Sequence, residues 1–226
     1  YYCPQETDLK GNHTQPRSYL SGEPAMRRAL RSNFSIKGQF LDRIDSYISQ
    51  GNINLIDEGN NCVKLEVIIS GGTWDCFPLD YRDTVINELY WAANTCYEKN
   101  RIMLSLEDEI KINETARFRI IGLTLETRPD SISEANIKRY RDYGVTRIQI
   151  GIQHHNDDIL RKVNRQCYTR HTIKAIRLLK QAGFKVVCHL MPDLPGSSPE
   201  LDRWMFQQAL ENTDLRFDDL KIYPTA

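Results

Sequence analysis

The residues of this sequence that could do chemistry stand at the ends of short apolar runs. Five such runs are rich in Val, Ile and Leu, and they span residues 64–70, 119–126, 147–153, 185–191 and 220–225. Polar groups and glycines gather where these runs end, and they include Gly71, Gly72, Thr73, Glu126, Arg128, Gln153, His189 and Met191. Paired glycines let a backbone approach a ligand closely, and the polar groups can fix its orientation. The pattern predicts a ligand site built from several strand ends.

Other residues with chemical potential have a plainer interpretation beside the functional one. A single cysteine such as Cys3 is more often structural than a metal ligand, and Lys64 is by default a solvated lysine. His189, inside an apolar run, is more often a hydrogen-bonded core residue than a functional group. His154 and His155 suggest a metal site, but neighbours on an extended segment point to opposite sides. We expect these two histidines at the surface or at the start of a helix.

The elements that must position these residues alternate between strand and helix. Most of the apolar runs are nearly continuous rather than alternating, as in strands of a parallel sheet covered on both faces. Helical spacing of apolar residues separates them, at 36–49, 80–98, 131–143, 169–182 and 198–212. This alternation predicts a parallel α/β fold, open or closed into a barrel, with its chemistry at the carboxyl ends of the strands.

Local signals predict where some of these helices begin and end. Ser131 and Glu134 have the spacing of a capping box, and Ser198 followed by Pro199 is a typical helix start. Gly144 and Gly183 stand where a helix would stop.

Composition excludes some classes of protein and leaves others open. The 226 residues carry 30 Lys and Arg against 30 Asp and Glu, but residues 10–37 and 135–180 are strongly basic. Such segregation favours a phosphate-binding face, although ordinary solvated helices would have the same composition. The six cysteines are scattered, which indicates a reduced, cytoplasmic protein, and no apolar run is long enough for a membrane span.

A set of motifs, taken in order, resembles one known family. The motifs are "YYCP", "SYLSGEPAMRRALR", "VIISGGTW", "GLTLETRPD", "GIQ", "NRQCYTRHT", "GFKVVCHLMPDLPG" and "DDLKIYPT". Together they resemble the radical S-adenosylmethionine (radical SAM) domain of the catalytic subunit of Elongator, a family that modifies the wobble uridine of tRNA. The resemblance runs from Tyr1 to Ala226.

The resemblance implies a fold and a set of cofactors. The family fold is a partial (β/α)6 barrel, and this chain would lack its first strand. A [4Fe-4S] cluster would be held by three cysteines, of which Cys3 matches the last. S-adenosylmethionine would contact Gly71, Gly72 and Thr73 through its amine, Glu126, Arg128 and Gln153 through its carboxylate or ribose, and His189 and Met191 near its adenine. Lys64 matches a family lysine linked to acetyl-CoA.

RNA contacts follow from the same resemblance and from the basic segments. The implied RNA-binding residues are Arg27, Arg28, Arg31, Arg165, Tyr168 and Arg170, where the tyrosine offers a stacking surface. Other Elongator-type subunits are further expected partners.

The resemblance also implies a domain organisation. Residues 1–60 would hold the remnant of the cluster loop and a basic excursion, and residues 61–226 the barrel strands two to six. The acetyltransferase domain of the family would be absent, so we expect a fragment that is inactive alone. Two alternatives remain open: a radical SAM enzyme acting on a small molecule or peptide, and a tRNA-binding module without catalysis.

Overall fold

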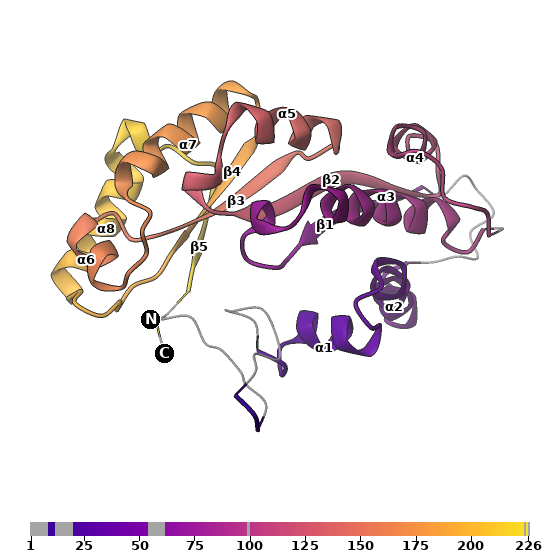
Figure 1. Cartoon of the computed structure of the whole chain (residues 1–226), viewed down its shortest axis with the longest axis horizontal. Coiled ribbons are helices and arrows are strands. Elements are labelled where there is room, and N and C mark those ends of the chain that lie inside the picture. Colours follow the sequence, from indigo (N-terminus) through magenta and orange to yellow (C-terminus); the bar gives the residue numbers. More distant parts are fainter. Residues whose placement is uncertain (1–8, 12–19, 54–61, 99, 224, 226) are drawn as a thin grey trace. The chain divides into compact units, whose positions relative to one another are not determined.

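The computed structural model describes residues 9–11, 20–53, 62–98, 100–223 and 225 (Figure 1). Cys3 lies outside these residues, so its role as a cluster ligand stays a prediction. Among the described residues, no helix is both long enough and apolar enough to cross a membrane.

Among the described residues, five strands form one sheet in the order β1-β2-β3-β4-β5. Their bounds are Val63–Ile69 (β1), Phe118–Thr127 (β2), Arg147–Gln153 (β3), Lys185–Leu190 (β4) and Asp219–Ile222 (β5). The pairs β2–β3, β3–β4 and β4–β5 are parallel. The α/β prediction is therefore confirmed, and each strand falls on a predicted apolar run.

Helices connect and precede these strands. Their bounds are Pro24–Arg31 (α1), Ile36–Ser49 (α2), Leu79–Thr95 (α3), Leu106–Asn113 (α4), Glu134–Asp142 (α5), Asp157–Lys162 (α6), Thr169–Gln181 (α7) and Pro199–Glu211 (α8). The sequence patterns predicted α2, α3, α5, α7 and α8, but not the shorter α1, α4 and α6. Short 3₁₀ turns span Trp74–Cys76, Pro129–Ser131 and Thr213–Leu215.

Most predicted helix ends are confirmed, and one is wrong. Ser198 caps α8 by accepting from the Leu201 N–H, with Pro199 in the first turn. Gly144 and Gly183 follow α5 and α7 with positive φ angles of 73° and 78°. The capping box at Ser131 is wrong, because Pro129–Ser131 closes a 3₁₀ turn and α5 begins later, capped by Ser133.

The strands differ in how far they are covered. In β4, every residue after Lys185 is buried, as predicted for a sheet covered on both faces. In β1, Lys64, Glu66 and Ile68 are exposed, so this strand is not covered on both faces. β1 ends the strand order, and the charged Lys64 and Glu66 would lose hydration if the face that carries them were covered.

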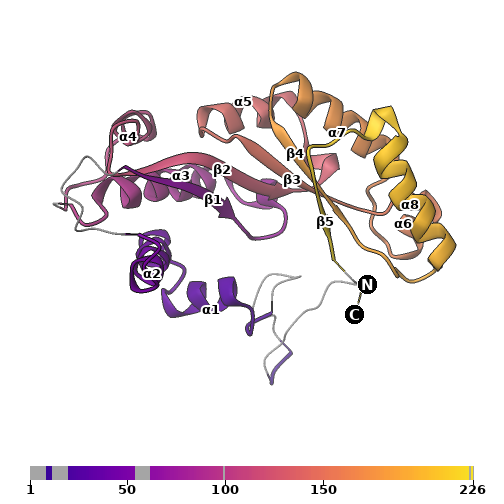
Figure 2. The same ribbon diagram turned by 180° about the vertical axis from the view of Figure 1, so that it is seen from behind.

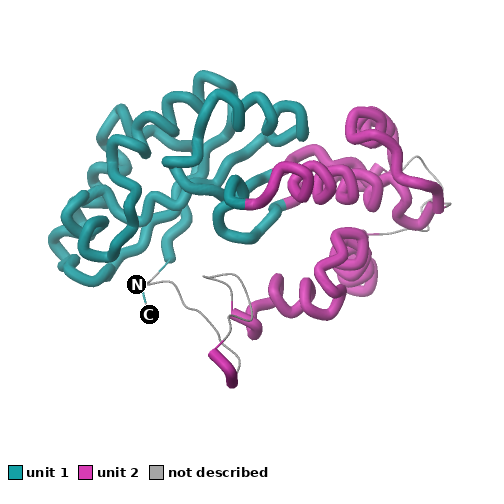
Figure 3. Tube along the Cα trace, in the orientation of Figure 1, with its two compact units in different colours: residues 1–4, 68–76, 124–226 teal, residues 5–67, 77–123 magenta. Residues whose placement is uncertain are grey.

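The chain divides into two compact units (Figure 3). Unit 1 comprises residues 1–4, 68–76 and 124–226, and unit 2 comprises residues 5–67 and 77–123. The boundary predicted near residue 60 from the family resemblance stays a prediction.

Unit 1 holds the larger part of the sheet and its helical cover. In both views of the ribbon, α5 and α7 lie together on one side of β3 and β4 (Figures 1 and 2). Tyr140 of α5 meets Phe184 edge to face, with ring centroids 6.2 Å apart. Both rings are buried with the apolar residues Ile148, Ile150 and Leu190 of the strands. This core fixes the strand ends on which the candidate site stands.

Candidate functional site

Four polar residues form a row across four neighbouring strands of unit 1. Glu126 of β2 is the register partner of Gln149 of β3, and His189 of β4 is the partner of Lys221 of β5. His189 also pairs with Gly151, which shares a face with Gln149 because side chains alternate along a strand. We call Glu126, Gln149, His189 and Lys221 the polar row.

Hydrogen bonds connect the members of the polar row. The Lys221 ammonium donates to Gln149 Oε1 over 3.0 Å, and His189 Nε2 lies 3.1 Å from the same oxygen. On the other side of the ring, His189 Nδ1 lies 3.9 Å from Glu126 Oε1. The Tyr223 ring lies against the imidazole, with centroids 5.2 Å apart.

The electrostatics of the row keep its histidine uncharged. Burial, and then the positive charge of Lys221, lower the pKa of His189 to about 4. At neutral pH the imidazole is therefore neutral, and its approach to Glu126 is not an ion pair. A neutral imidazole offers one N–H donor and one lone pair, which suits recognition of a ligand better than charge neutralisation.

The end of β3 is strained around Gln153. Gln153 has a φ angle of 76°, and the register with β4 shifts between Gly151 and Gln153. A non-glycine residue in this region costs of order 1–3 kcal/mol, and such strain concentrates at functional sites. The buried Gln153 Oε1 has no hydrogen-bond partner in the described part of the chain. This oxygen can accept an N–H or O–H of a ligand.

Gly151 lets two side chains approach β3 close to the register shift between Gly151 and Gln153. A Cβ on Gly151 would lie 3.0 Å from Arg165 Nη2 and 3.0 Å from Gln153 Nε2. Arg165 uses that space to donate from Nη2 to the Gly151 carbonyl over 2.6 Å. The Arg165 side chain is thus hydrogen-bonded to the backbone of β3 beside the polar row.

The loop Gly71-Gly72-Thr73 follows β1 and is anchored through Asp75. Gly72 has a φ angle of 83°, a conformation that favours glycine. Asp75 Oδ2 accepts from the hydroxyl of Thr127 over 2.6 Å and from that of Tyr140 over 2.5 Å. Sequence reasoning missed Asp75, whose partners lie more than fifty residues away.

The two adjacent histidines after β3 are buried, so the prediction that they lie at the surface is wrong, although they directly precede the start of α6. Asn156, not either histidine, caps α6. His154 Nδ1 accepts from the Asn156 N–H over 2.9 Å, and its Nε2 lies 3.5 Å from Asp202 Oδ1. Both ring nitrogens of His155 are buried with no hydrogen-bond partner among the described residues. Burial lowers the pKa of both residues, that of His155 to about 4.

The loop after β4 is pinned by Asp202 of α8. Asp202 accepts from the Ser197 hydroxyl over 2.5 Å and from the Asp193 N–H over 2.8 Å. Met191, predicted near adenine, packs with Leu201 against the buried cluster of Ile159, Val163 and Leu194. The Met191 N–H donates to the Gln153 carbonyl, so its backbone joins the strained end of β3.

The remaining predicted residues lie apart from the polar row. In unit 1, Arg128 makes a two-point ion pair with Asp130 and donates to the Arg165 carbonyl, 3.1 Å away. The Tyr168 ring lies 5.5 Å from the Arg161 guanidinium, and Arg170 is exposed. These groups flank the end of β3 and the start of α7.

Other predicted residues belong to unit 2. Lys64 is exposed on β1, and Arg27 and Arg31 are exposed on α1. Arg31 Nη2 lies 3.1 Å from Asp42 Oδ2, and Arg28 Nε lies 4.0 Å from the same oxygen. Ion pairs of this kind near the surface contribute little to stability.

Comparison with known proteins decides the family. The model of the Radical SAM superfamily matches residues 61–205. This chain belongs to the radical SAM superfamily. The chain is 37% identical over 224 residues to Elongator complex protein 3 of Dictyostelium discoideum, and 40% identical over 223 residues to the tRNA uridine(34) acetyltransferase of Methanocaldococcus infernus. In each case 99% of this chain is matched.

A solved structure gives the same answer. The archaeal Elp3 of Methanocaldococcus infernus with an N-terminal deletion superposes with a TM-score of 0.76 and 38% identity, over 87% of this chain and 43% of that one. The predicted resemblance to the Elongator catalytic subunit is confirmed by this homology. The chain spans 38% and 39% of the two relatives' own lengths.

Membership of this radical SAM superfamily implies a [4Fe-4S] cluster and S-adenosylmethionine. The described residues fit an adenosyl ligand, since Gln153 Oε1 is a buried acceptor without a partner among them and the polar row presents a neutral imidazole. No group of three or more His, Cys, Asp and Glu residues within the described ranges could hold a metal ion. The assignment of Cys3 as a cluster ligand stays a prediction from the resemblance.

Proposed function

We propose that this chain is the radical SAM part of an enzyme that modifies C5 of the wobble uridine of tRNA, using S-adenosylmethionine and acetyl-CoA. The observation that carries the proposal is the 40% identity, along 99% of the chain, to a relative named tRNA uridine(34) acetyltransferase. A second relative of the same name, from Methanocaldococcus jannaschii, is 39% identical over 209 residues.

The residues of unit 1 would bind and orient the adenosyl cofactor. When bound together, the cluster and S-adenosylmethionine supply a 5′-deoxyadenosyl radical. The Gly71-Gly72-Thr73 loop would hold the methionine amine with backbone groups. Asp75, which follows the loop, would fix its position through hydrogen bonds from Thr127 and Tyr140. Glu126, Arg128 and Gln153 would hold the carboxylate or ribose, and His189 would lie near the adenine together with Met191.

Acetyl-CoA and RNA would be held by other residues. Lys64, exposed on β1, would contact acetyl-CoA, whose acetyl group is the source of the new carbon at C5. RNA phosphates would be neutralised by Arg27, Arg28, Arg31, Arg165 and Arg170, with Tyr168 as a stacking surface. Two relatives are named as parts of the Elongator complex, so further subunits are proposed partners.

The proposal is tested on the full-length protein purified and reconstituted without oxygen. We expect brown cluster absorbance and cleavage of S-adenosylmethionine to 5′-deoxyadenosine, both lost in Cys3→Ala. An iron-free protein would support the non-catalytic alternative, and absorbance retained in Cys3→Ala would overturn the ligand assignment.

RNA binding separates the proposal from the small-molecule alternative. We expect tRNA affinity that falls steeply with salt, because several phosphates are neutralised. Arg27→Glu combined with Arg170→Glu should weaken binding at least tenfold, whereas Arg216→Glu, an exposed arginine outside the predicted set, should not. Equal affinity of both variants and the wild type for tRNA would contradict the predicted RNA face.

A further inference from the structure

The hydrogen bonds of the polar row define which atom of Gln149 faces its neighbours. An ammonium group only donates hydrogen bonds, so the atom 3.0 Å from Lys221 Nζ must be the amide oxygen of Gln149. That same oxygen lies 3.1 Å from His189 Nε2. An oxygen can accept from two donors, so the His189 Nε2 must carry a proton to bond to it.

The other ring nitrogen is fixed by the same reasoning. A neutral imidazole has one N–H, so a proton on Nε2 leaves Nδ1 with a lone pair. Nδ1 lies 3.9 Å from Glu126 Oε1, a distance too long for a hydrogen bond between them. The Nδ1 lone pair therefore remains to accept a hydrogen bond from a ligand group that brings an N–H or O–H donor.

We infer that Gln149 and Lys221 are positioning residues, which hold the His189 proton on Nε2 so that Nδ1 accepts a hydrogen bond from the bound adenosyl group. The inference rests on the proposed function for the identity of the ligand. The assignment of the proton itself depends only on the contacts within the polar row.

The alternative tautomer would change what the site recognises. With the proton on Nδ1, the ring would donate toward Glu126 and Nε2 would present a lone pair to the lone pairs of Gln149 Oε1. That arrangement loses one buried hydrogen bond and sets two acceptors 3.1 Å apart, which is unfavourable in a buried site. The adenosyl group would also lose its acceptor, since Nδ1 would be occupied.

The positive charge of Lys221 helps to keep His189 neutral at physiological pH, so the ring carries a single proton. The groups that face the ring are Glu126 from β2, Gln149 from β3, Lys221 from β5, and Tyr223, which follows β5. Lys221 opposes a second proton on the ring, in addition to orienting Gln149. A doubly protonated ring would donate from both nitrogens and would reject the same ligand donor.

The inference is tested first by the protonation of the ring itself. We would label the histidines of the full-length, reconstituted protein with ¹⁵N and read the protonated nitrogen from the nitrogen shifts. His154 and His171 accept backbone N–H groups at Nδ1, so they serve as internal references for an Nε2-protonated ring. We expect His189 to show the same pattern. A proton on Nδ1 of His189 in the wild type would overturn the inference, with or without a ligand.

Variants of Gln149 test whether it sets the tautomer. In Gln149→Leu we expect a mixture of tautomers and an affinity for S-adenosylhomocysteine about tenfold lower, which is about 1.4 kcal/mol. Gln149→Glu keeps an acceptor at this position and should restore the Nε2 proton. Gln207→Leu, at an exposed glutamine of α8, should leave both readouts unchanged. An unaltered tautomer and affinity in Gln149→Leu would contradict the inference.

Lys221→Met tests the second positioning residue without removing the Gln149 acceptor. Wild-type affinity for S-adenosylhomocysteine should be flat between pH 7.5 and pH 5.5, because His189 stays neutral well below this range. In the variant the pKa of His189 should rise, because one of the two causes that lower it is removed, so on further acidification affinity should begin to fall at a higher pH than in the wild type. The same onset in both proteins would contradict a role for Lys221. A wild-type protein that shows the Nε2 proton but binds no adenosyl ligand would instead contradict the proposed function.

Discussion

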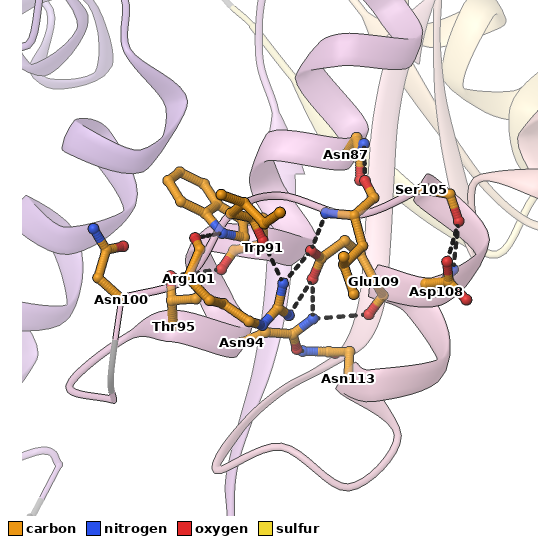
Figure 4. A network of polar contacts seen from close by, with 12 residues as sticks. Asn87, Trp91, Asn94, Thr95, Asn100, Arg101, Ser105, Asp108, Glu109 and Asn113 are labelled. Atoms are coloured by element: carbon orange, nitrogen blue, oxygen red, sulfur yellow. Dashed lines mark hydrogen bonds and ion pairs between the residues drawn. The ribbon is translucent and has the colours of Figure 1, made fainter.

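Each unit of this chain buries a polar cluster, and the two clusters differ in how completely they are hydrogen-bonded. In unit 2, the cluster centres on Glu109 of α4, whose side chain is fully buried (Figure 4). In unit 1, it is the polar row at the end of the sheet, with the neighbouring Gln153 and His155. Saturated clusters fix a fold, whereas buried groups that lack partners need an explanation in terms of ligands or water.

The Glu109 cluster uses both carboxylate oxygens in full. Arg101 donates to Oε1 and Oε2 over 2.6 Å and 2.7 Å, the Leu104 N–H donates to Oε1, and Asn94 donates to Oε2. Asn113 in turn donates to Asn94 Oδ1. Burial alone would raise the pKa of Glu109, but these donors outweigh it and hold the pKa below its ordinary value. The cluster therefore ties α3, α4 and the segment between them together.

The cluster of unit 1 is incomplete by the same measure. Gln153 Oε1 and both ring nitrogens of His155 have no hydrogen-bond partner among the described residues, and His189 Nδ1 faces a carboxylate at 3.9 Å. The comparison shows that the Glu109 cluster uses its buried polar groups for stability, whereas Gln153 and His155 keep buried polar atoms that accept no hydrogen bond from the described residues.

The largest expected effect breaks the saturated cluster. Glu109→Gln removes the charge that compensates Arg101, and we expect a loss of about 3 to 5 kcal/mol in the free energy of unfolding. Urea unfolding at pH 7 measures it. Glu107→Gln, at an exposed position of the same helix, is the matched control and should change stability by no more than about 0.5 kcal/mol. Equal costs for the two variants would mean that the Glu109 cluster does not stabilise unit 2.

Some of this contrast was predictable from the sequence. The apolar runs located all five strands of the described residues, and the runs of β3 and β4 are nearly continuous because these parallel strands are buried along most of their length. The polar residues at the strand ends pointed to Glu126, Gln153 and His189. Gln149 and Lys221 were visible only as single polar residues inside apolar runs, with no sign that they share a hydrogen-bonding atom.

The parts of the candidate site that the sequence did not predict depend on strand register and on tertiary contacts. Lys221 and Gln149 are 72 positions apart, and only the pairing of β3, β4 and β5 brings them to one face. The burial of His154 and His155 follows from the turn between β3 and α6, where the Thr169 hydroxyl donates to the His155 carbonyl. The local periodicity of the sequence does not predict such long-range contacts.

The next prediction compares how His155 of unit 1 and Glu109 of unit 2 make stability depend on pH. The pKa of His155 falls from 6.5 to about 4 on folding because of burial and then the neighbouring His154. Between these values the unfolded chain binds the proton more tightly, so stability present above pH 6.5 is lost as the pH falls toward 4. In His155→Phe, the loss of folding stability between neutral pH and pH 4 should be smaller by about 3 kcal/mol. Glu109, whose pKa is lowered from 4.5, loses its contribution only at lower pH.

Urea unfolding of the wild type and His155→Phe between pH 7 and pH 4 measures this difference. We expect the stability curves to converge or cross on acidification, since the variant has no ring to protonate. Parallel curves over the whole range would mean that His155 titrates alike in the folded and unfolded states, so that its burial is not maintained in solution.

The smallest expected effect concerns an anchor in unit 1 that is saturated, unlike the polar row beside it. Tyr140→Phe removes one of two hydroxyl donors to Asp75 Oδ2 and should cost about 2 kcal/mol in stability. Thr127→Val removes the other donor. Because Asp75 follows the Gly71-Gly72-Thr73 loop, both variants should also weaken binding of S-adenosylhomocysteine a few-fold. Tyr81→Phe, at an exposed tyrosine, is the control.

The double variant decides how the two donors act. Both hydroxyls bond to the same carboxylate oxygen, so their contributions should be coupled, and the pair should cost measurably more or less than the sum of the singles. Coupling in stability together with coupling in affinity would mean that Asp75 transmits the order of the α5 core to the glycine loop. Coupling in stability with unchanged affinity would restrict Asp75 to the core and leave recognition to Gln153 Oε1 at the end of β3 and to His189 Nδ1 of β4.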